Sequence, residues 1–175
     1  RDRVMNFDMA AELAAAEGIA VRSIVTTDDV ASSPAESRAA RRGVAGNVFV
    51  FKVAGAAAER RLPLDACESI ARRANARTYT MGIALEPGSL PETRRPSFVI
   101  GSEDMEIGVG VHGEPGIARQ PLATADAAAD LMLDRILSEM PATEGDRVAV
   151  LVNSLGGTPT MELYIVYRRV RERLK

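Results

Sequence analysis

One segment of the chain combines glycines with a reactive side chain. His112, the only histidine in the sequence, lies in the run GVGVHGEPG at residues 108–116. Glycines remove side-chain bulk and permit unusual backbone angles, so a ligand could approach the imidazole closely. A neutral imidazole can act as a base, a metal ligand or a nucleophile near pH 7. From spacing alone, two interpretations stay open: a functional histidine, or a surface histidine in a tight turn.

The same run matches the glycine pattern of dinucleotide-binding loops, at Gly108, Gly110 and Gly113. That pattern requires a helix to begin at the third glycine, because the helix N-terminus binds the pyrophosphate. Pro115 and Pro121 follow closely, so no helix can begin at once. The sequence therefore disfavours a dinucleotide-dependent oxidoreductase.

Charged residues suggest two further sites, each with an ordinary explanation. Asp28 and Asp29 could bind a cation, although paired loop carboxylates are more often solvated or capping residues. Arg41 and Arg42, just before Gly43, could bind a phosphate or form a solvated basic pair. The chain contains no P-loop sequence, and one histidine with one cysteine cannot build the usual structural zinc site.

Two other nucleophile types are present without the context that activates them. Ser154 lacks the first glycine of a nucleophile elbow, which predicts an ordinary loop residue. Cys67 lies in a helical-looking stretch with no positioned base, which predicts a small packing residue.

Composition limits the class of protein. The 175 residues are 46% hydrophobic and carry a net charge of −2, with 22 basic and 24 acidic residues interspersed, which offers no basic face for nucleic acid. A single cysteine excludes an intrachain disulfide and favours a reducing compartment. Apolar runs stop well short of the ~20 residues that span a bilayer. We expect a soluble, cytoplasmic protein without a membrane partner, and a chain cut from a longer one.

Helical and strand patterns alternate along the chain, which predicts an α/β fold with some parallel pairing. Thr124 and Thr158 are predicted helix caps, and the last helix should bury a face formed by Leu163, Tyr167, Val170 and Leu174. A soft domain boundary is expected near residues 86–96. Helices are predicted over 10–16, 35–42, 54–61, from 63, over 124–140 and from 158; strands are predicted over 19–25, 44–53, 79–85, 97–100, 105–111 and 147–152.

Five motifs occur in order along the chain: NFDMA at 6–10, RRGVAG at 41–46, KVAGAAAE at 52–59, MEIGVGVHGEPG at 105–116 and ELY at 162–164. Together they resemble the substrate-binding, or K, part of the dihydroxyacetone kinases, from Asn6 to Lys175. The resemblance implies a two-domain α/β sandwich-type architecture, present here as a fragment. Residues 1–90 would be the C-terminal part of the first domain, and residues 91–175 the second domain with the His112 loop.

The resemblance also implies a chemistry. His112 would add to the carbonyl carbon of a short ketose, dihydroxyacetone or erythrulose, and hold it as a covalent hemiaminal between the domains of a homodimer. This part would bind no nucleotide or metal. Phosphate would come from ATP with Mg, or from a phosphocarrier-linked ADP, on a separate helical L domain or subunit.

The chain departs from the family pattern at three points. Arg3 occupies the register of the aspartate that helps deprotonate the substrate, and Asp2 lies one place early, so no general base is assigned. The family's N-terminal half, with a second histidine, and its C-terminal stretch are missing. Phe51 stands where relatives often have a polar residue. It could be a core-packing residue, or it could indicate similarity to the relatives that accept four-carbon ketoses. The alternative function is a non-catalytic regulatory paralogue that binds a ligand or a partner protein.

Overall fold

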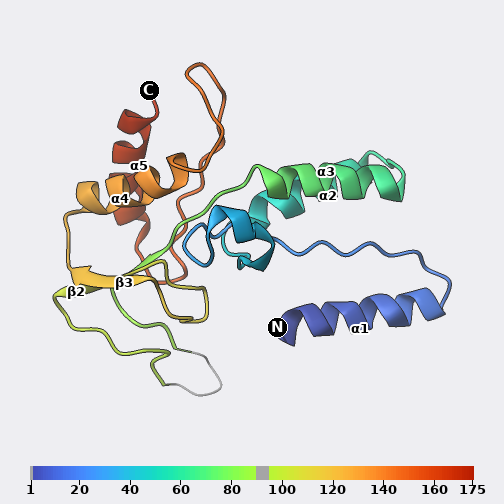
Figure 1. Cartoon of the computed structure of the whole chain (residues 1–175), viewed down its shortest axis with the longest axis horizontal. Helices are drawn as coiled ribbons and strands as arrows, with labels where there is room; N and C mark the ends of the chain where they lie inside the picture. The colour runs from blue at the N-terminus through green and yellow to red at the C-terminus, as the bar shows by residue number, and fades with distance from the viewer. Residues whose placement is uncertain (1, 90–94) are drawn as a thin grey trace.

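The computed structural model describes residues 2–89 and 95–175, with side chains from Val4 onward (Figure 1). The expected boundary between residues 90 and 91 lies outside the described residues. Helices and strands follow in the order α1 (Asp2–Ala16), the 3-10 helix η1 (Ala35–Ala40), α2 (Asn47–Glu59), α3 (Leu64–Ala76), β1 (Ile83–Ala84), β2 (Asp104–Ile107), β3 (Ala118–Pro121), α4 (Ala125–Leu137) and α5 (Thr160–Arg173). The fold is mixed α/β, as the sequence predicts.

The sheet is small and antiparallel. β2 lies in the middle, with β1 on one side and β3 on the other. Ile83 pairs with Ile107, and Ile107 pairs in turn with Ala118. The expected parallel pairing appears as one isolated bridge, between Asp29 and Thr80. β2 therefore ends directly before the segment that carries His112.

Helices pack as two pairs, α2 with α3 and α4 with α5 (Figure 1). Ala129 and Leu133 of α4 pack with Val170 of α5, and Leu137, Val166 and Leu174 complete this cluster. The hydroxyl of Thr124 accepts the N–H of Ala127, which confirms the predicted cap. Pro159, rather than Thr158, precedes α5 and makes no side-chain cap bond. Tyr167, predicted on the buried face, is exposed, and Val166 packs there instead.

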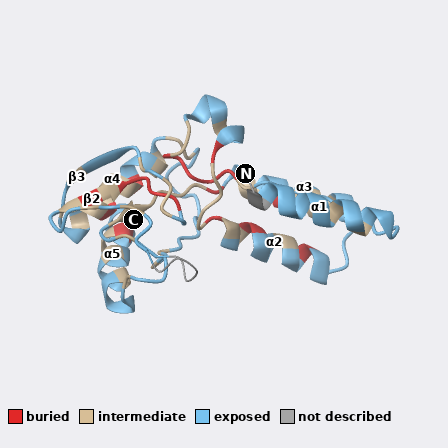
Figure 2. Ribbon diagram, turned by 90° about the horizontal axis from the view of Figure 1, so that it is seen from below, coloured by how far each residue is buried: buried red, intermediate tan, exposed pale blue. Residues whose placement is uncertain are grey.

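Buried residues gather where segment 27–31 lies against β2 and the loop that follows it, whereas the faces of α1, α2 and α3 are largely exposed (Figure 2). Met105 and Val30 are almost fully buried there. The base of the His112 loop thus lies beside the largest fully buried side chains of the described chain.

The strand predicted over 44–53 is wrong, because residues 47–53 form the first half of α2 and residues 44–46 lead into it. Periodicity cannot distinguish a short apolar run in a strand from one in a buried helix, and the alanines after Val53 extend the run into helix-forming sequence. β3 forms at residues 118–121, where no strand was predicted.

Three other predicted strands are not formed. Residues 19–25, 97–100 and 147–152 belong to no strand of the described residues. The first of these segments runs as a long extended connection from α1 (Figure 1). A strand requires a neighbour for its backbone N–H and C=O groups, and propensity largely reflects packing against that neighbour. The β-branched composition of these segments is thus compatible with a sheet position, but it does not create one.

Candidate functional site at the His112 loop

The loop at residues 108–116 begins where β2 ends and is closed by its own backbone hydrogen bonds. The N–H of Gly113 donates to the carbonyl of Gly110 at 3.1 Å, and the N–H of Gly110 donates to the carbonyl of Glu114 at 3.0 Å. Gly108 and Gly113 have φ angles of +76° and +81°, which favour glycine because other residues lack easy access to this region. The turn presents His112, whose side chain is 36% exposed.

Glu114 contacts both the backbone and the side chain of His112. One carboxylate oxygen, Oε2, accepts the backbone N–H of His112 at 2.9 Å, and the other, Oε1, lies 3.1 Å from the imidazole Nδ1. When Nδ1 carries the proton and donates it to this carboxylate, the lone pair of the neutral ring is on Nε2. The arrangement favours the tautomer in which Nε2 is the nucleophile or base.

The pKa of the Glu114 carboxyl lies below its ordinary value of 4.5. Partial burial by itself raises this pKa, but the hydrogen bonds from the backbone N–H groups of His112 and Glu114 and from the imidazole outweigh it. The group is therefore a carboxylate at neutral pH and accepts both contacts from His112.

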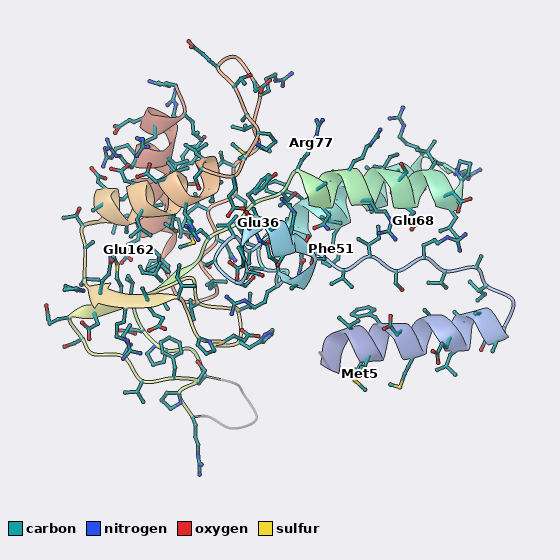
Figure 3. The ribbon with its side chains drawn as sticks, viewed as in Figure 1. Met5, Glu36, Phe51, Glu68, Arg77 and Glu162 are labelled. Atoms are coloured by element: carbon teal, nitrogen blue, oxygen red, sulfur yellow. The ribbon has the colours of Figure 1, made fainter. Side chains whose placement is uncertain are left out.

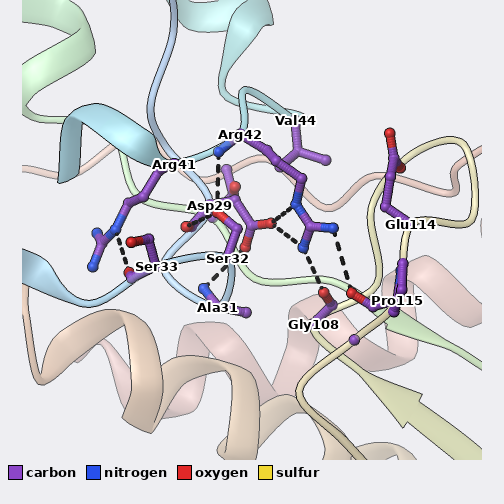
Figure 4. Close-up of polar contacts among 12 residues, drawn as sticks. Asp29, Ala31, Ser32, Ser33, Arg41, Arg42, Val44, Gly108, Glu114 and Pro115 are labelled. Atoms are coloured by element: carbon purple, nitrogen blue, oxygen red, sulfur yellow. Dashed lines mark hydrogen bonds and ion pairs between the residues drawn. The ribbon is translucent and has the colours of Figure 1, made fainter. Parts of the chain in front are cut away.

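The guanidinium of Arg42 reaches the loop from a distant part of the chain (Figure 4). Its Nη2 donates to the carbonyl of Gly108 at 2.8 Å, and its Nη1 lies 3.5 Å from the carbonyl of Pro115. Its Nε donates to Asp29 Oδ2 at 2.9 Å. One side chain thus contacts both ends of the His112 loop and a buried carboxylate.

Asp29 is almost fully buried, and burial raises the pKa of its carboxyl above the ordinary 3.8, although the N–H of Ala31 and the charge of Arg42 act in the opposite direction. Its Oδ1 accepts the N–H of Ala31 at 3.0 Å. Both carboxylate oxygens therefore have partners, which a buried carboxylate requires.

The comparisons with known proteins decide the family. The model of a family described as "Dak1 domain" matches residues 2–175. The chain belongs to the Dak1 domain family.

Relatives of this Dak1 chain include enzymes named for two sugars. A dihydroxyacetone-binding subunit DhaK of a PTS-dependent dihydroxyacetone kinase from Listeria innocua is 49% identical over 98% of the chain and 51% of that protein. An L-erythrulose kinase from Pectobacterium atrosepticum is 41% identical over 98% of the chain and 30% of that protein. The chain thus spans about half the length of the DhaK subunit, and less of the longer kinase.

Solved structures agree with the fold. The dihydroxyacetone kinase of C. freundii, in complex with AMP-PNP and Mg²⁺, superposes with a TM-score of 0.83 at 32% identity, over 95% of the chain and 30% of that protein. A dihydroxyacetone kinase operon co-activator, Dha-DhaQ, superposes with a TM-score of 0.84 at 31% identity, over 96% of the chain and 52% of that protein. A similar fold therefore occurs within a kinase and within a protein named as a co-activator.

The Dak1 chain uses both predicted charged pairs internally. Asp28 Oδ2 accepts the N–H of Gly46 at 2.9 Å and the hydroxyl of Thr80 at 2.8 Å, so this carboxylate is buried in internal hydrogen bonds rather than solvated. Arg41 is buried and forms an ion pair with Glu139 at 2.6 Å, so the solvated basic pair is wrong. Among the described residues, no group of three His, Cys, Asp or Glu side chains is placed to hold a metal ion.

The remaining candidates have structural surroundings. No helix follows Gly113, in agreement with the argument against a dinucleotide loop. Ser154 Oγ accepts the N–H of Gly156 within a turn. Cys67 lies in α3, as predicted, with its thiol near the carbonyl of Leu62. Phe51 lies on α2 and is 69% exposed, so it has no core packing in the described chain (Figure 3).

Sequence reasoning missed the links to the His112 loop. Glu114 was part of the quoted motif but had no assigned role, although a carboxylate two residues from a histidine is a usable signal. Arg42 lies 66 residues from Gly108, and no local pattern predicts that contact. No helix in the described part of the chain is long and apolar enough to cross a membrane.

Proposed function

We propose that the protein is the substrate-binding part of a dihydroxyacetone-type kinase, in which His112 captures the ketone of a short ketose as a hemiaminal. The observation that supports this most directly is the contact between His112 Nδ1 and Glu114, because it leaves the imidazole lone pair on Nε2. The names of the dihydroxyacetone and erythrulose kinases among the relatives support the substrate class.

The capture step is an addition with no leaving group. The Nε2 lone pair of His112 forms a bond to the carbonyl carbon, and the π electrons of the C=O bond move to its oxygen, which takes a proton from water. The proton on Nδ1 passes to the Glu114 carboxylate, 3.1 Å away, and from there to solvent, so the ring ends neutral. The adduct therefore has the mass of the protein plus one intact ketose.

Covalent capture explains selection and positioning together. An imidazole adds to an electron-poor ketone but not to a polyol such as glycerol. An anchored ketose keeps its terminal hydroxyl in one place, and phosphoryl transfer depends mainly on positioning and electrostatics. The choice between a three-carbon and a four-carbon ketose remains part of the test.

The donor is assigned to a partner. We infer that a helical L domain or subunit carries either ATP with Mg or a phosphocarrier-linked ADP. The name of the Listeria innocua relative, a subunit of a PTS-dependent kinase, supports the second, and the C. freundii kinase with AMP-PNP and Mg²⁺ supports the first. The proposed assembly is a cytoplasmic homodimer of two α/β domains, to which residues 1–90 and 91–175 contribute.

Intact mass spectrometry tests the proposal. The full-length protein is incubated with dihydroxyacetone or erythrulose, and the His112→Ala variant is the matched control. We expect an adduct of one whole ketose that is absent in the variant. Loss of one water from the adduct would instead indicate a lysine Schiff base. No adduct with either ketose would contradict the proposal.

A non-catalytic regulatory paralogue is the second candidate, and the similarity to a solved dihydroxyacetone kinase operon co-activator favours it. Arg3, in the register of the family's aspartate, favours it too. A regulator has no need of a nucleophile, so the intact loop around His112 supports the kinase. The adduct experiment separates the two.

A further inference from the structure

Arg42 connects the two ends of the loop that carries His112. Its guanidinium donates to the carbonyl of Gly108 before the turn, and faces the carbonyl of Pro115 after it. The segment from Gly108 to Pro115 is a short turn with three glycines, the first of them Gly108 itself, and this composition alone gives little rigidity. The guanidinium therefore supplies a fixed distance between the two ends of the turn.

Arg42 is itself fixed before it reaches the loop. Its Nε and Nη2 both lie within 3 Å of Asp29 Oδ2, at 2.9 and 2.7 Å. Its backbone carbonyl accepts the N–H of Asp29, and its backbone N–H donates to the hydroxyl of Ser32. The side chain of Asp29 is only 1% exposed, whereas the side chain of Arg42 is 26% exposed. The anchor of Arg42 is thus a fully buried carboxylate.

The residue type matters to this arrangement. A guanidinium is planar and directs several N–H donors in fixed directions, so one side chain can serve a carboxylate and two carbonyls together. A lysine ammonium would keep the charge opposite Asp29 but could not hold all three acceptors in the same geometry.

We propose that Arg42 is a positioning residue for His112: anchored on Asp29, it joins Gly108 to Pro115 and sets the direction in which the imidazole meets the ketone. This inference rests on the proposed function of His112. Arg42 contacts neither ring nitrogen in the structure, so it acts through the loop backbone.

The expected effect is on the rate of capture more than on folding. Displacing a reacting group by about 1 Å can cost about 100-fold in rate. Arg42→Lys keeps the ion pair with Asp29 and should leave the melting temperature within a few degrees of the wild type. The rate of hemiaminal formation should fall about tenfold or more, with a smaller change in the ketose concentration that gives half-saturation.

The experiment compares three full-length proteins: wild type, Arg42→Lys and the control Arg169→Lys. Arg169 makes a bidentate pair with Asp130 between α4 and α5, and so loses the same geometry far from the loop. Adduct formation is followed by intact mass over time. ¹⁵N spectra of the His112 imidazole, assigned by comparison with His112→Ala, report its tautomer. A third variant, Arg42→Ala, is measured with and without added guanidinium ion.

Support consists of slow capture in Arg42→Lys, normal capture in Arg169→Lys, and partial recovery of Arg42→Ala by guanidinium. An unchanged rate and unchanged imidazole signals in Arg42→Lys would overturn the inference and leave the proposed function intact. If the wild type forms no adduct, the proposed function fails. The inference about the loop is then tested by hydrogen exchange of the backbone amides of residues 110–113. Exchange must be faster in Arg42→Lys than in the wild type and in Arg169→Lys. Equal exchange rates would contradict the inference as well.

Discussion

The carboxylate of Glu114 makes two contacts with one residue, the backbone and the ring of His112. The backbone contact fixes the position of the His112 α-carbon. The contact with Nδ1 fixes the orientation of the ring and determines which nitrogen keeps a lone pair. This pairing follows the general pattern in which a catalytic imidazole is oriented by a carboxylate through its second nitrogen.

We expect Glu114→Gln to slow ketose capture by about tenfold or less, because a neutral amide makes a weaker hydrogen bond than a carboxylate and cannot take the Nδ1 proton. The measurement is the rate of adduct formation by intact mass at neutral pH. Glu103→Gln removes the same charge from an exposed position near β2 and is the control. Equal rates in the two variants would show that the contact has no part in capture.

Ion pairs between α4 and α5 supplement a small apolar cluster. Asp130 accepts from Arg169 Nε at 2.9 Å and Nη2 at 2.7 Å, and from Arg173 Nη1 at 2.8 Å. These hydrogen bonds, with that from Arg169 the largest cause, lower the pKa of Asp130 to about 2 from an ordinary 3.8. Asp130, one of three aspartates of α4 that pair with arginines of α5, therefore stays charged in mild acid.

The lowered pKa of Asp130 gives this contact a predictable pH dependence. A carboxylate whose pKa is lower in the folded state stabilises the fold above its ordinary pKa, and the contribution disappears as pH falls through the folded value. We expect the urea midpoint of the wild type to exceed that of Asp130→Asn by a constant amount above pH 4, with the gap closing between 3.8 and about 2.

The control for this series is Asp8→Asn, which removes a carboxylate from α1, away from α4 and α5. Its urea midpoint should follow that of the wild type over the same pH range. A gap for Asp130→Asn that persists unchanged at pH 2 would contradict the role given to the Asp130 charge.

At the scale of the whole molecule, Arg41 joins two parts of the chain that are far apart in sequence. Its side chain is fully buried, and its Nη2 pairs at 2.6 Å with Glu139, which lies just after the end of α4. Its Nε donates to the carbonyl of Ser33 at 2.8 Å. Because neighbouring Arg42 contacts the His112 loop, this pair of arginines links the segment before α2 to both the site and α4.

We expect Glu139→Gln to lower the free energy of unfolding by about 3 kcal/mol, because it leaves the Arg41 charge buried without a counter-charge. The double variant Arg41→Met, Glu139→Leu should recover much of that loss, since replacing both partners of a buried pair by apolar residues is often nearly neutral. Urea unfolding of the full-length proteins measures both. A double variant less stable than Glu139→Gln would contradict this account.

Local sequence determined the elements whose signals are local. The cap at Thr124, the helix that begins after Pro63, and the turn at the glycines around His112 depend on residues within a few positions of one another. The Dak1 motifs, too, are short and ordered along the chain, so membership of the family could be read before the fold. His112 was singled out for the same reason, since a histidine among glycines is a local pattern.

Only the tertiary structure decided what depends on distant partners. Residues 19–25 and 147–152 have strand composition, but no described neighbour pairs with them, so no strand forms. Residues 47–53, predicted as part of a strand, form the first half of α2, which packs against α3. Arg41 and Arg42 look alike in sequence, yet one binds Glu139 and the other Asp29 and Gly108. A charge finds its partner through the path of the chain, which local spacing does not encode.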